Sequence, residues 1–566
     1  VRRMPFLVGA VAVIVLAVAV GVWYFFMRPT QPPIETASVE NMALPLPDKP
    51  SIAVLPFDNL SGDPEQEYFS DGITDDLITD LSKVSGLFVV ARHSSFLYKG
   101  QPVKIKKVAE ELGIRYVLEG SVRRAGDKIR INAQLIDATT GGHLWAERYD
   151  RDYKDIFALQ DEVIQRIVFA LSVKLTQKEK EQLARKYTDN LEAYDYYLRG
   201  EQSLHSFTVE GVAKASSMFE RAIDLDPNFA QAYAAHGMAS YYMWEYSLNE
   251  SRLRFENDRE QAFQFATKAL ALDSILPMAH QVLAGIHLLY PQRFDEAITS
   301  AARAVALEPN NADSYVTKAY VLTKAGRHEE AQKEINTAFR LNPNPPPHYY
   351  FHLSEVQFNL RQYSEAVKSI KKAGNTIPDW LQGWYLAPSY AYLGRLDEAR
   401  AELKKFVKVF VRHRLHYVVN ALFSFSYHKL EEDNNHWHEG LRKAGLQDIP
   451  KVFRRNMDDI VENLLSGKEI KDLAVGRTWS GFNPEGGGQW WIQFTEDGKL
   501  PTRGAWGTES GSYWIEEFRI CWKWQVPYQY QDGCGFVYPN PIGTAEEKNQ
   551  YEWVNYAFAY PFSVEE

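Results

Sequence analysis

Cysteine, clustered basic residues and catalytic signatures are all scarce in this sequence of 566 residues. Two cysteines, Cys521 and Cys534, permit one intrachain disulfide at most, and they otherwise remain separate buried thiols. The formal net charge is −10, and no large Lys and Arg cluster of the kind that binds phosphates is present, which argues against nucleic-acid binding. The sequence shows no nucleophile elbow, P-loop, kinase signature or Cys–His dyad. These absences point away from an enzyme, although a convergent site would leave no linear motif.

Charge is also missing from residues 5–27. As a helix this run would extend roughly 34 Å, enough to cross a hydrocarbon core of about 30 Å. Two arginines precede it and one follows, so the bias of positive charge favours a cytoplasmic stub at residues 1–4 and an exported remainder. The alternative is a cleaved signal peptide, but the run is long for one and lacks a small-residue cleavage site. We therefore predict a single transmembrane helix, and an oxidising compartment would allow Cys521 and Cys534 to pair.

Residues 28–50 contain six prolines and predict an extended spacer. From Ser51 strand and helix patterns alternate. We expect a strand at Ile52–Pro56, a helix at Glu67–Ser82, a short helix that ends at Gly113, and a hairpin of residues 115–124 and 128–137. The pattern predicts an α/β layer over residues 51–178, with a mixed sheet and helices on one face.

Two phrases in this stretch are informative: SIAVLPFDNLSGDPEQEYFSDGITDDL and YVLEGSVRRAGDKIRINAQLIDATTGGHLWAERYD. They resemble the TolB-like amino-terminal domain that bacterial membrane proteins place between a membrane anchor and a helical repeat array. The resemblance implies a protein-contact or sensing surface on the outer side of the inner membrane, and it implies no catalytic residues or cofactor.

Residues 190–410 repeat. The helix ends AIDLDP, ALALDS, AVALEP and AFRLNP recur, and the later ones are 35 and 34 residues apart, which matches the period of tetratricopeptide repeats (TPRs). This predicts an all-α TPR solenoid whose concave face binds a protein or peptide. From the repeat register, the predicted groove-lining positions are Tyr315, Lys318, Tyr350 and Tyr390. Residues 411–467 are predicted to form a helical cap.

Residues 468–566 are rich in tryptophan, with glycine-rich turns between short alternating runs. They predict a small antiparallel barrel or sandwich of six to eight strands. The phrases TESGSYWIEEFRICWKW, CGFVYPNP and EWVNYAFAYPFSV resemble the β tail that follows the repeats in some bacterial class III adenylate/guanylate cyclase-type proteins. The alternative of a sugar-acting enzyme here would need paired acids, and spacing supports no pair among Glu485, Asp497, Glu509, Glu516 and Glu517.

Two clusters could suggest metal ligands. Asp71, Asp75, Asp76 and Asp80 are interpreted instead as a helix cap, with Ser70, and a solvated helix face. Five histidines (His413, His416, His428, His436 and His438) are interpreted as surface or packing residues, since no Cys or Glu-x-x-His arrangement completes a ligand set. No metal site is expected from the sequence.

The sequence thus predicts a multidomain, single-pass protein of the bacterial inner membrane whose bulk is periplasmic and binds proteins. It would be the sensory or regulatory part of a cyclase-type signalling system, with homo-oligomerisation left open. Because only residues 1–4 would lie inside, an effector would have to precede Val1 or be a separate partner. A structural envelope scaffold without a signalling role is the main alternative.

Overall fold

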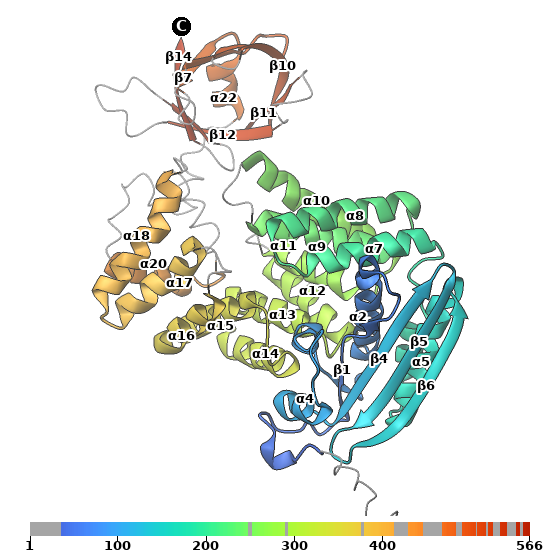
Figure 1. Cartoon of the computed structure of the whole chain (residues 1–566). Coiled ribbons are helices and arrows are strands. Elements are labelled where there is room, and N and C mark those ends of the chain that lie inside the picture. The colour runs from blue at the N-terminus through green and yellow to red at the C-terminus, as the bar shows by residue number, and fades with distance from the viewer. Residues whose placement is uncertain are drawn as a thin grey trace, which may run out of the picture.

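The computed structural model describes an α/β domain, a helical array and a C-terminal β domain (Figure 1). The described residues are 36–246, 252–288, 293–374, 379–412, 428–444, 467–482, 489–504, 507–516, 519–524, 533–539, 551–554 and 559–565. No helix within these ranges is both long and apolar enough to span a bilayer. The predicted transmembrane helix 5–27 lies outside the described residues, as do the stub at 1–4 and most of the 28–50 spacer.

The α/β domain follows the predicted alternation closely. Its elements are β1 (Ser51–Val54), β2 (Asp58–Asn59), α2 (Glu67–Ser82), β3 (Phe88–Val89), α3 (Arg92–Phe96), α4 (Ile105–Leu112), β4 (Tyr116–Ala125), β5 (Lys128–Asp137), β6 (Gly142–Asp152), α5 (Ile156–Ala170) and α6 (Gln177–Leu183). The predicted cap glycine is confirmed, because Gly113 ends α4 in the left-handed conformation (φ 61°) that other residues adopt at a cost.

The sheet is mixed, as predicted, in the order β3-β1-β4-β5-β6, with β2 beside β4. Strand β1 pairs in parallel with β3 and β4, and β4 to β6 form an antiparallel meander. The expectation of helices on one face is wrong. Ile52 and Val54 pack in the core with α2 and α5, whereas Ala53 and Leu55 pack with α4 on the opposite face. A central parallel strand is apolar on both sides, so both faces must be covered.

The helical array consists, in its described part, of six antiparallel helix pairs: α7 (Leu191–Leu204) with α8 (Val209–Leu225), α9 (Ala230–Tyr246) with α10 (Arg252–Leu272), α11 (Pro277–His287) with α12 (Phe294–Leu307), α13 (Ala312–Lys324) with α14 (His328–Leu341), α15 (Pro347–Asn359) with α16 (Tyr363–Ala373), and α17 (Asp379–Tyr392) with α18 (Leu396–Arg412). Small residues at the pair interfaces, such as Ala319, Ala331 and Ala338, are fully buried and let the helices approach closely.

The first helices of successive pairs also contact one another, from α9 through α11, α13 and α15 to α17. Within α9, α11, α15 and α17, every residue whose side chain is described is buried or half-buried. The second helices keep an exposed face. The first helices therefore form the interior layer of the array.

Helix α20 (Glu431–Lys443) packs along the edge formed by the turns within the last three pairs. Leu430 covers Gly326, where an added Cβ would collide with the Leu430 side chain. His436 stacks on Tyr363 and Tyr392, and Trp437 stacks on Trp384. Helix α20 lies within residues 411–467, the predicted helical cap, of which 413–427 and 445–466 lie outside the described residues.

In the C-terminal domain, α22 (Gly467–Ala474) precedes eight described strands: β7 (Thr478–Phe482), β8 (Gln489–Gln493), β9 (Lys499–Gly504), β10 (Gly507–Glu516), β11 (Arg519–Trp524), β12 (Gly533–Pro539), β13 (Tyr551–Val554) and β14 (Ala559–Glu565). The strands are antiparallel, and pairing of β14 with β7 closes them into a barrel, one of the two predicted architectures. Trp479 is buried against Phe494.

Candidate functional site

The four predicted groove residues all contact other parts of the array. Lys318 forms an ion pair with Glu334 of α14, and the Tyr315 hydroxyl donates to the Pro309 carbonyl. Tyr350 packs on Phe339 and Lys372, and Tyr390 is only 2% exposed. None of the four is an exposed side chain. Their role in partner binding stays a prediction, and in this conformation their contacts hold the repeats together.

The α/β domain is seated on the turns between repeats. These turns carry the recurring helix-end phrases, and each one makes a contact at this boundary. Asp226 accepts a hydrogen bond from Thr188, and Asp273 pairs with Arg185 at 2.6 Å, both in the segment after α6. The next two turns contact the sheet itself. The turns that end successive repeats therefore also form a contact surface for the chain's own α/β domain and the segment that follows it.

Asn310, in the turn after α12, is the centre of the third contact. Its side-chain amide donates to the carbonyls of Ser82 and Val84, at 3.3 and 3.1 Å, and its Oδ1 accepts from the Val89 amide at 3.4 Å. Val89 belongs to β3, the edge strand of the sheet. The array thus supplies a hydrogen-bond partner to an edge that would otherwise be open.

The turn after α14 forms the fourth contact. Arg340 donates to the carbonyls of Gly113 and Pro45, both at 2.8 Å, and its guanidinium lies over the Phe88 ring. The Ala91 amide donates to the Leu341 carbonyl at 2.9 Å, and the Ser94 hydroxyl donates to Asn342 at 2.6 Å. We call these four turn contacts the domain interface.

The acidic residues of α2 also lie at this boundary, so the interpretation as a cap and a solvated face is wrong. Helix α2 begins at Glu67, before Ser70 and Asp71, and its N-cap is Gln66. Asp71 is buried against Lys99. Asp76 accepts hydrogen bonds from Tyr194 of α7 and Gln160 of α5, and burial raises the pKa of Asp76 to about 7. Asp80 is likewise buried and pairs with Lys83 and Tyr187. A helix placed between a sheet and an array has no solvated face.

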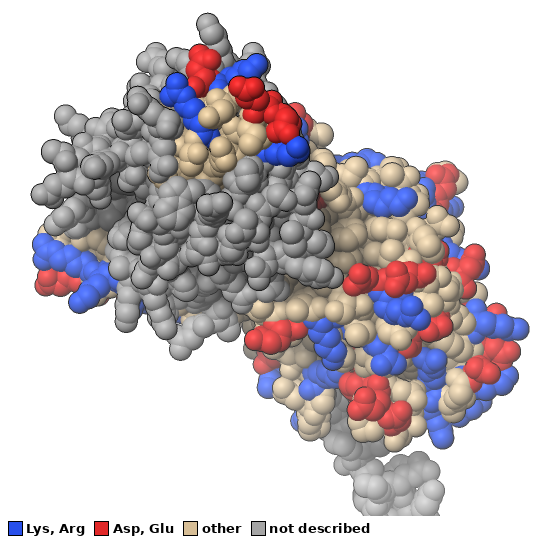
Figure 2. Space-filling model, turned by 90° about the horizontal axis from the view of Figure 1, so that it is seen from above, with Lys and Arg blue, Asp and Glu red and all other residues tan. Residues whose placement is uncertain are grey.

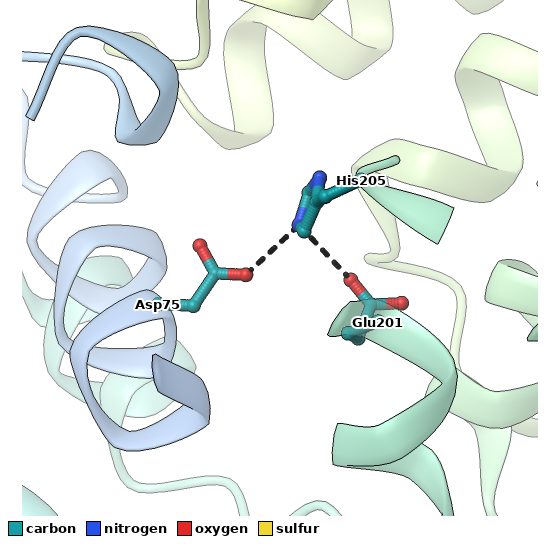
Figure 3. Close-up of side chains that lie close together, drawn as sticks. All are labelled: Asp75, Glu201 and His205. Atoms are coloured by element: carbon teal, nitrogen blue, oxygen red, sulfur yellow. Dashed lines mark hydrogen bonds and ion pairs between the residues drawn. The ribbon is translucent and has the colours of Figure 1, made fainter. Parts of the chain in front are cut away.

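Asp75 projects from α2 toward the C-terminal end of α7, where it meets His205 and Glu201 (Figure 3). His205 Nε2 lies 3.1 Å from Asp75 Oδ2 and 3.9 Å from Glu201 Oε2. Arg92 Nε is 3.4 Å from the same Asp75 oxygen. Burial favours neutral Asp75, but Arg92 and His205 outweigh it and hold the pKa of Asp75 below its usual range. Burial raises the pKa of Glu201 to about 8.

The predicted histidine cluster separates. His413 and His416 lie outside the described residues. His428, His436 and His438 are packing residues around α20, and burial lowers the pKa of His428 to about 3 and the pKa values of His436 and His438 to about 4.

The backbone register places the two cysteines opposite each other. Cys521 of β11 and Cys534 of β12 are direct partners in an antiparallel pair. Such partners have Cα atoms about 4.5–5.5 Å apart, within the range that a disulfide spans. The predicted bond therefore remains a sound prediction.

Of the acids considered for an enzyme in this domain, Asp497 is the one whose side chain the structure describes. Asp497 pairs with Lys499 and accepts from Thr495 in the turn before β9. Glu509 and Glu516 lie on β10, and Glu485 and Glu517 lie outside the described residues.

Comparison with known proteins supports the modular division. Residues 292–373 match the sequence profile of anaphase-promoting complex, cyclosome, subunit 3. Together with the helix pairs and the period of about 34 residues, this decides the nature of the array. The array is a tetratricopeptide-repeat solenoid. A TPR repeat-containing protein of Bacillus subtilis (strain 168), YpiA, is 24% identical over 173 residues, covering 30% of this chain and 37% of its own length.

Residues 48–167 match a second profile, the second domain of HilA/YgeH-like transcriptional regulators. A Rhizobium meliloti (strain 1021) protein that is named, provisionally, adenylate cyclase 3 is 53% identical over 252 residues, or 44% of this chain and 42% of the relative. The chain thus spans less than half the length of the curated relatives it matches.

Solved structures give weaker likenesses. A thermophilic TPR protein of Thermus thermophilus covers 36% of this chain and 98% of its own, with 16% identity and a TM-score of 0.28. TolB of Acinetobacter baumannii covers 23% of this chain and 30% of its own, with 22% identity and a TM-score of 0.17. At these scores the assignment of the array rests on its period, its helix pairs and the profile match instead.

Sequence reasoning missed Glu201, His205 and the domain interface. His205 lies 130 residues from Asp75, on a different module, so no spacing rule connects them. The recurring helix-end phrases show where each repeat ends. The repeat period does not show that a neighbouring domain contacts these turns.

Proposed function

We propose that this chain is the protein-binding, regulatory part of a membrane-anchored signalling protein of the cyclase type. The observation that carries the proposal is the domain interface. It joins a TPR solenoid, a fold that binds peptides and proteins, to an α/β domain and the segment that follows it, along four successive turns. A partner bound to either module can therefore bias the other.

The surface charge fits a protein partner better than a nucleic acid. On the described face in Figure 2, acidic and basic side chains are interspersed. The net charge of −10 gives no general attraction to phosphates.

The cyclase connection rests on the Rhizobium meliloti relative, whose shared 252 residues cover less than half of either protein. Membrane anchoring rests on the apolar residues 5–27, and the periplasmic side rests on the flanking arginines. A reporter fused after residue 565 tests this directly. Alkaline phosphatase should be active there and β-galactosidase inactive, and the reverse pattern would place the bulk of the chain inside the cell.

An envelope scaffold without signalling would use the same interface, so a second experiment separates the two functions. Cyclic AMP and cyclic GMP are measured in cells that express the full protein, with Asn310 and Arg340 intact or both changed to Ala. We expect the double variant to loosen the α/β domain and change the nucleotide level by severalfold at equal protein abundance. An unchanged level, with exchange data showing that the interface has opened, would favour the plain scaffold.

A further inference from the structure

We propose that Asp75, Glu201 and His205 form a binding site for a divalent transition metal ion, with Zn²⁺ as the best match. The site would link α2 of the α/β domain to the C-terminal end of α7 in the first repeat. The inference goes beyond the proposed function and does not depend on it, because a metal link would serve a scaffold and a signalling protein equally.

The geometry of the three side chains suits a small cation. One ligand atom from each residue lies within 4.8 Å of the other two. The His205 Nε2 distances of 3.1 and 3.9 Å bracket the separation of about 3.3 Å expected between ligands of a tetrahedral ion with bonds of roughly 2.0–2.1 Å. One imidazole and two carboxylates, with a water in the fourth position, are ligands that Zn²⁺ accepts.

Glu201 supplies an independent reason to expect a cation. The residue is only 9% exposed, its Oε1 has no hydrogen-bond partner in the described structure, and its carboxylate is directed toward His205 (Figure 3). A buried carboxylate without a partner is costly unless a positive charge compensates it. A metal ion bound between Glu201 and Asp75 would provide that charge.

Arg92 gives the competing explanation. Its Nε lies 3.4 Å from Asp75 Oδ2, so Asp75 already has one cationic neighbour. Arg92 also acts on Glu201, but burial outweighs it and raises the pKa of Glu201 to about 8. Metal binding requires a neutral imidazole and ionised carboxylates, so Glu201 would release its proton. The four residues then carry a net charge of about −1, which the bound divalent ion changes to about +1. A purely protein-based network would bind no metal, and this difference is measurable.

The experiment uses the full chain in detergent after removal of metals with a chelator. Zn²⁺ binding is measured by calorimetry, and Co²⁺ serves as a spectroscopic probe of a tetrahedral site. We expect one saturable site per chain, and we expect His205→Ala and Glu201→Gln each to weaken Zn²⁺ binding at least tenfold and to remove the Co²⁺ absorption.

Matched controls are His143→Ala, an exposed histidine on β6, and Glu192→Gln, an exposed acid on α7 itself. Both should bind metal as the unchanged chain does. Because Glu201→Gln preserves size, its circular dichroism without metal should match that of the parent. Zn²⁺ should raise the unfolding temperature of the parent and of the two controls, but not that of His205→Ala or Glu201→Gln. Equal Zn²⁺ affinity in the parent, His205→Ala and Glu201→Gln would overturn the proposal, as would the absence of any saturable site.

Discussion

Lys324 of α13 and Glu355 of α15 form an ion pair in the interior of the array, where their side chains are 6% and 2% exposed. The Tyr385 hydroxyl of α17 donates to the same Glu355 oxygen at 2.8 Å, so the network joins three first helices. Burial opposes ionisation, but Lys324 outweighs it and holds the pKa of Glu355 well below its usual range. These residues hold together the layer in which the sequence predicted a ligand groove.

Lys324→Met leaves Glu355 buried without its counter-ion, and breaking a buried pair in this way costs about 3 kcal/mol or more. We expect the free energy of unfolding of the array to fall by that amount in urea titrations. The control is Lys318→Met, which breaks the more exposed pair with Glu334 and should cost less than about 1 kcal/mol. Equal losses in the two variants would show that burial does not set the strength of these pairs.

Cys521 and Cys534 give a second prediction at this scale, because they are direct register partners. After denaturation without reductant, protein isolated from its native cells should contain no free thiol, and digestion should yield one peptide pair joined through these residues. Recovery of two free thiols from protein isolated in the presence of a thiol-blocking reagent would contradict both the bond and an oxidising location.

At the scale of elements, helix α20 is held by contacts that depend on neutral histidines. His428, His436 and His438 have pKa values lowered from 6.5 by burial, so the unfolded chain binds more protons than the folded one on acidification. Their contribution to stability is complete above about pH 6.5 and is lost progressively toward pH 4. Asp433, whose pKa is lowered by His328 despite burial, acts in the same direction at lower pH.

We therefore expect α20 to separate from the array before the other repeats unfold as the pH falls from 7 to 5. Hydrogen exchange of α20 peptides, corrected for the intrinsic effect of pH, should rise several-fold, while exchange in α13 stays constant. If α20 is equally protected at both pH values, its packing does not rest on these histidines.

The contact between the turn after α12 and the sheet edge gives another prediction. Asn310→Ala removes three side-chain hydrogen bonds, to Ser82, Val84 and Val89. The Ser82 and Val84 carbonyls keep backbone donors, but the buried Val89 amide loses the Asn310 oxygen, which costs about 2 kcal/mol. We expect faster amide exchange in β3 and the end of α2. Asn336→Ala, on the exposed side of α14, should leave both unchanged. Unchanged exchange in Asn310→Ala would show that the turn does not protect the edge.

Elements whose pattern is local could be predicted from the sequence. Helix α2 has the expected bounds, Gly113 ends α4, and the hairpin of β4 and β5 turns where Ala125, Gly126 and Asp127 indicate. The position of α4 on the second face of the sheet could not be predicted, since Ile52 to Val54 read as buried without showing what covers each side. The burial of the first helices of the repeats could not be predicted for the same reason, because the sequence does not show what covers each face of a helix.

At the scale of the whole molecule, the described modules differ in how closely they are joined. The sequence shows three modules, because each has its own pattern of apolar residues. It does not show which of these modules share a surface. Two turns of the TPR array contact the α/β domain directly, through residues such as Asn310, Arg340 and Asn342, and two more contact the segment after α6. Signalling from one module to the other would depend on that surface.

Cross-linking in the full chain tests this claim most directly. Asn344 contacts Ser94 of α3 through its backbone amide, and the exposed Leu97 lies one helical turn further, about 5 Å along the axis. A chain with Leu97→Cys and Asn344→Cys, treated with a short bis-maleimide, should cross-link internally in high yield. A chain with Leu97→Cys and Glu398→Cys, on α18, should not. Equally low yields in the two chains would contradict the seating of the α/β domain on the turns between repeats.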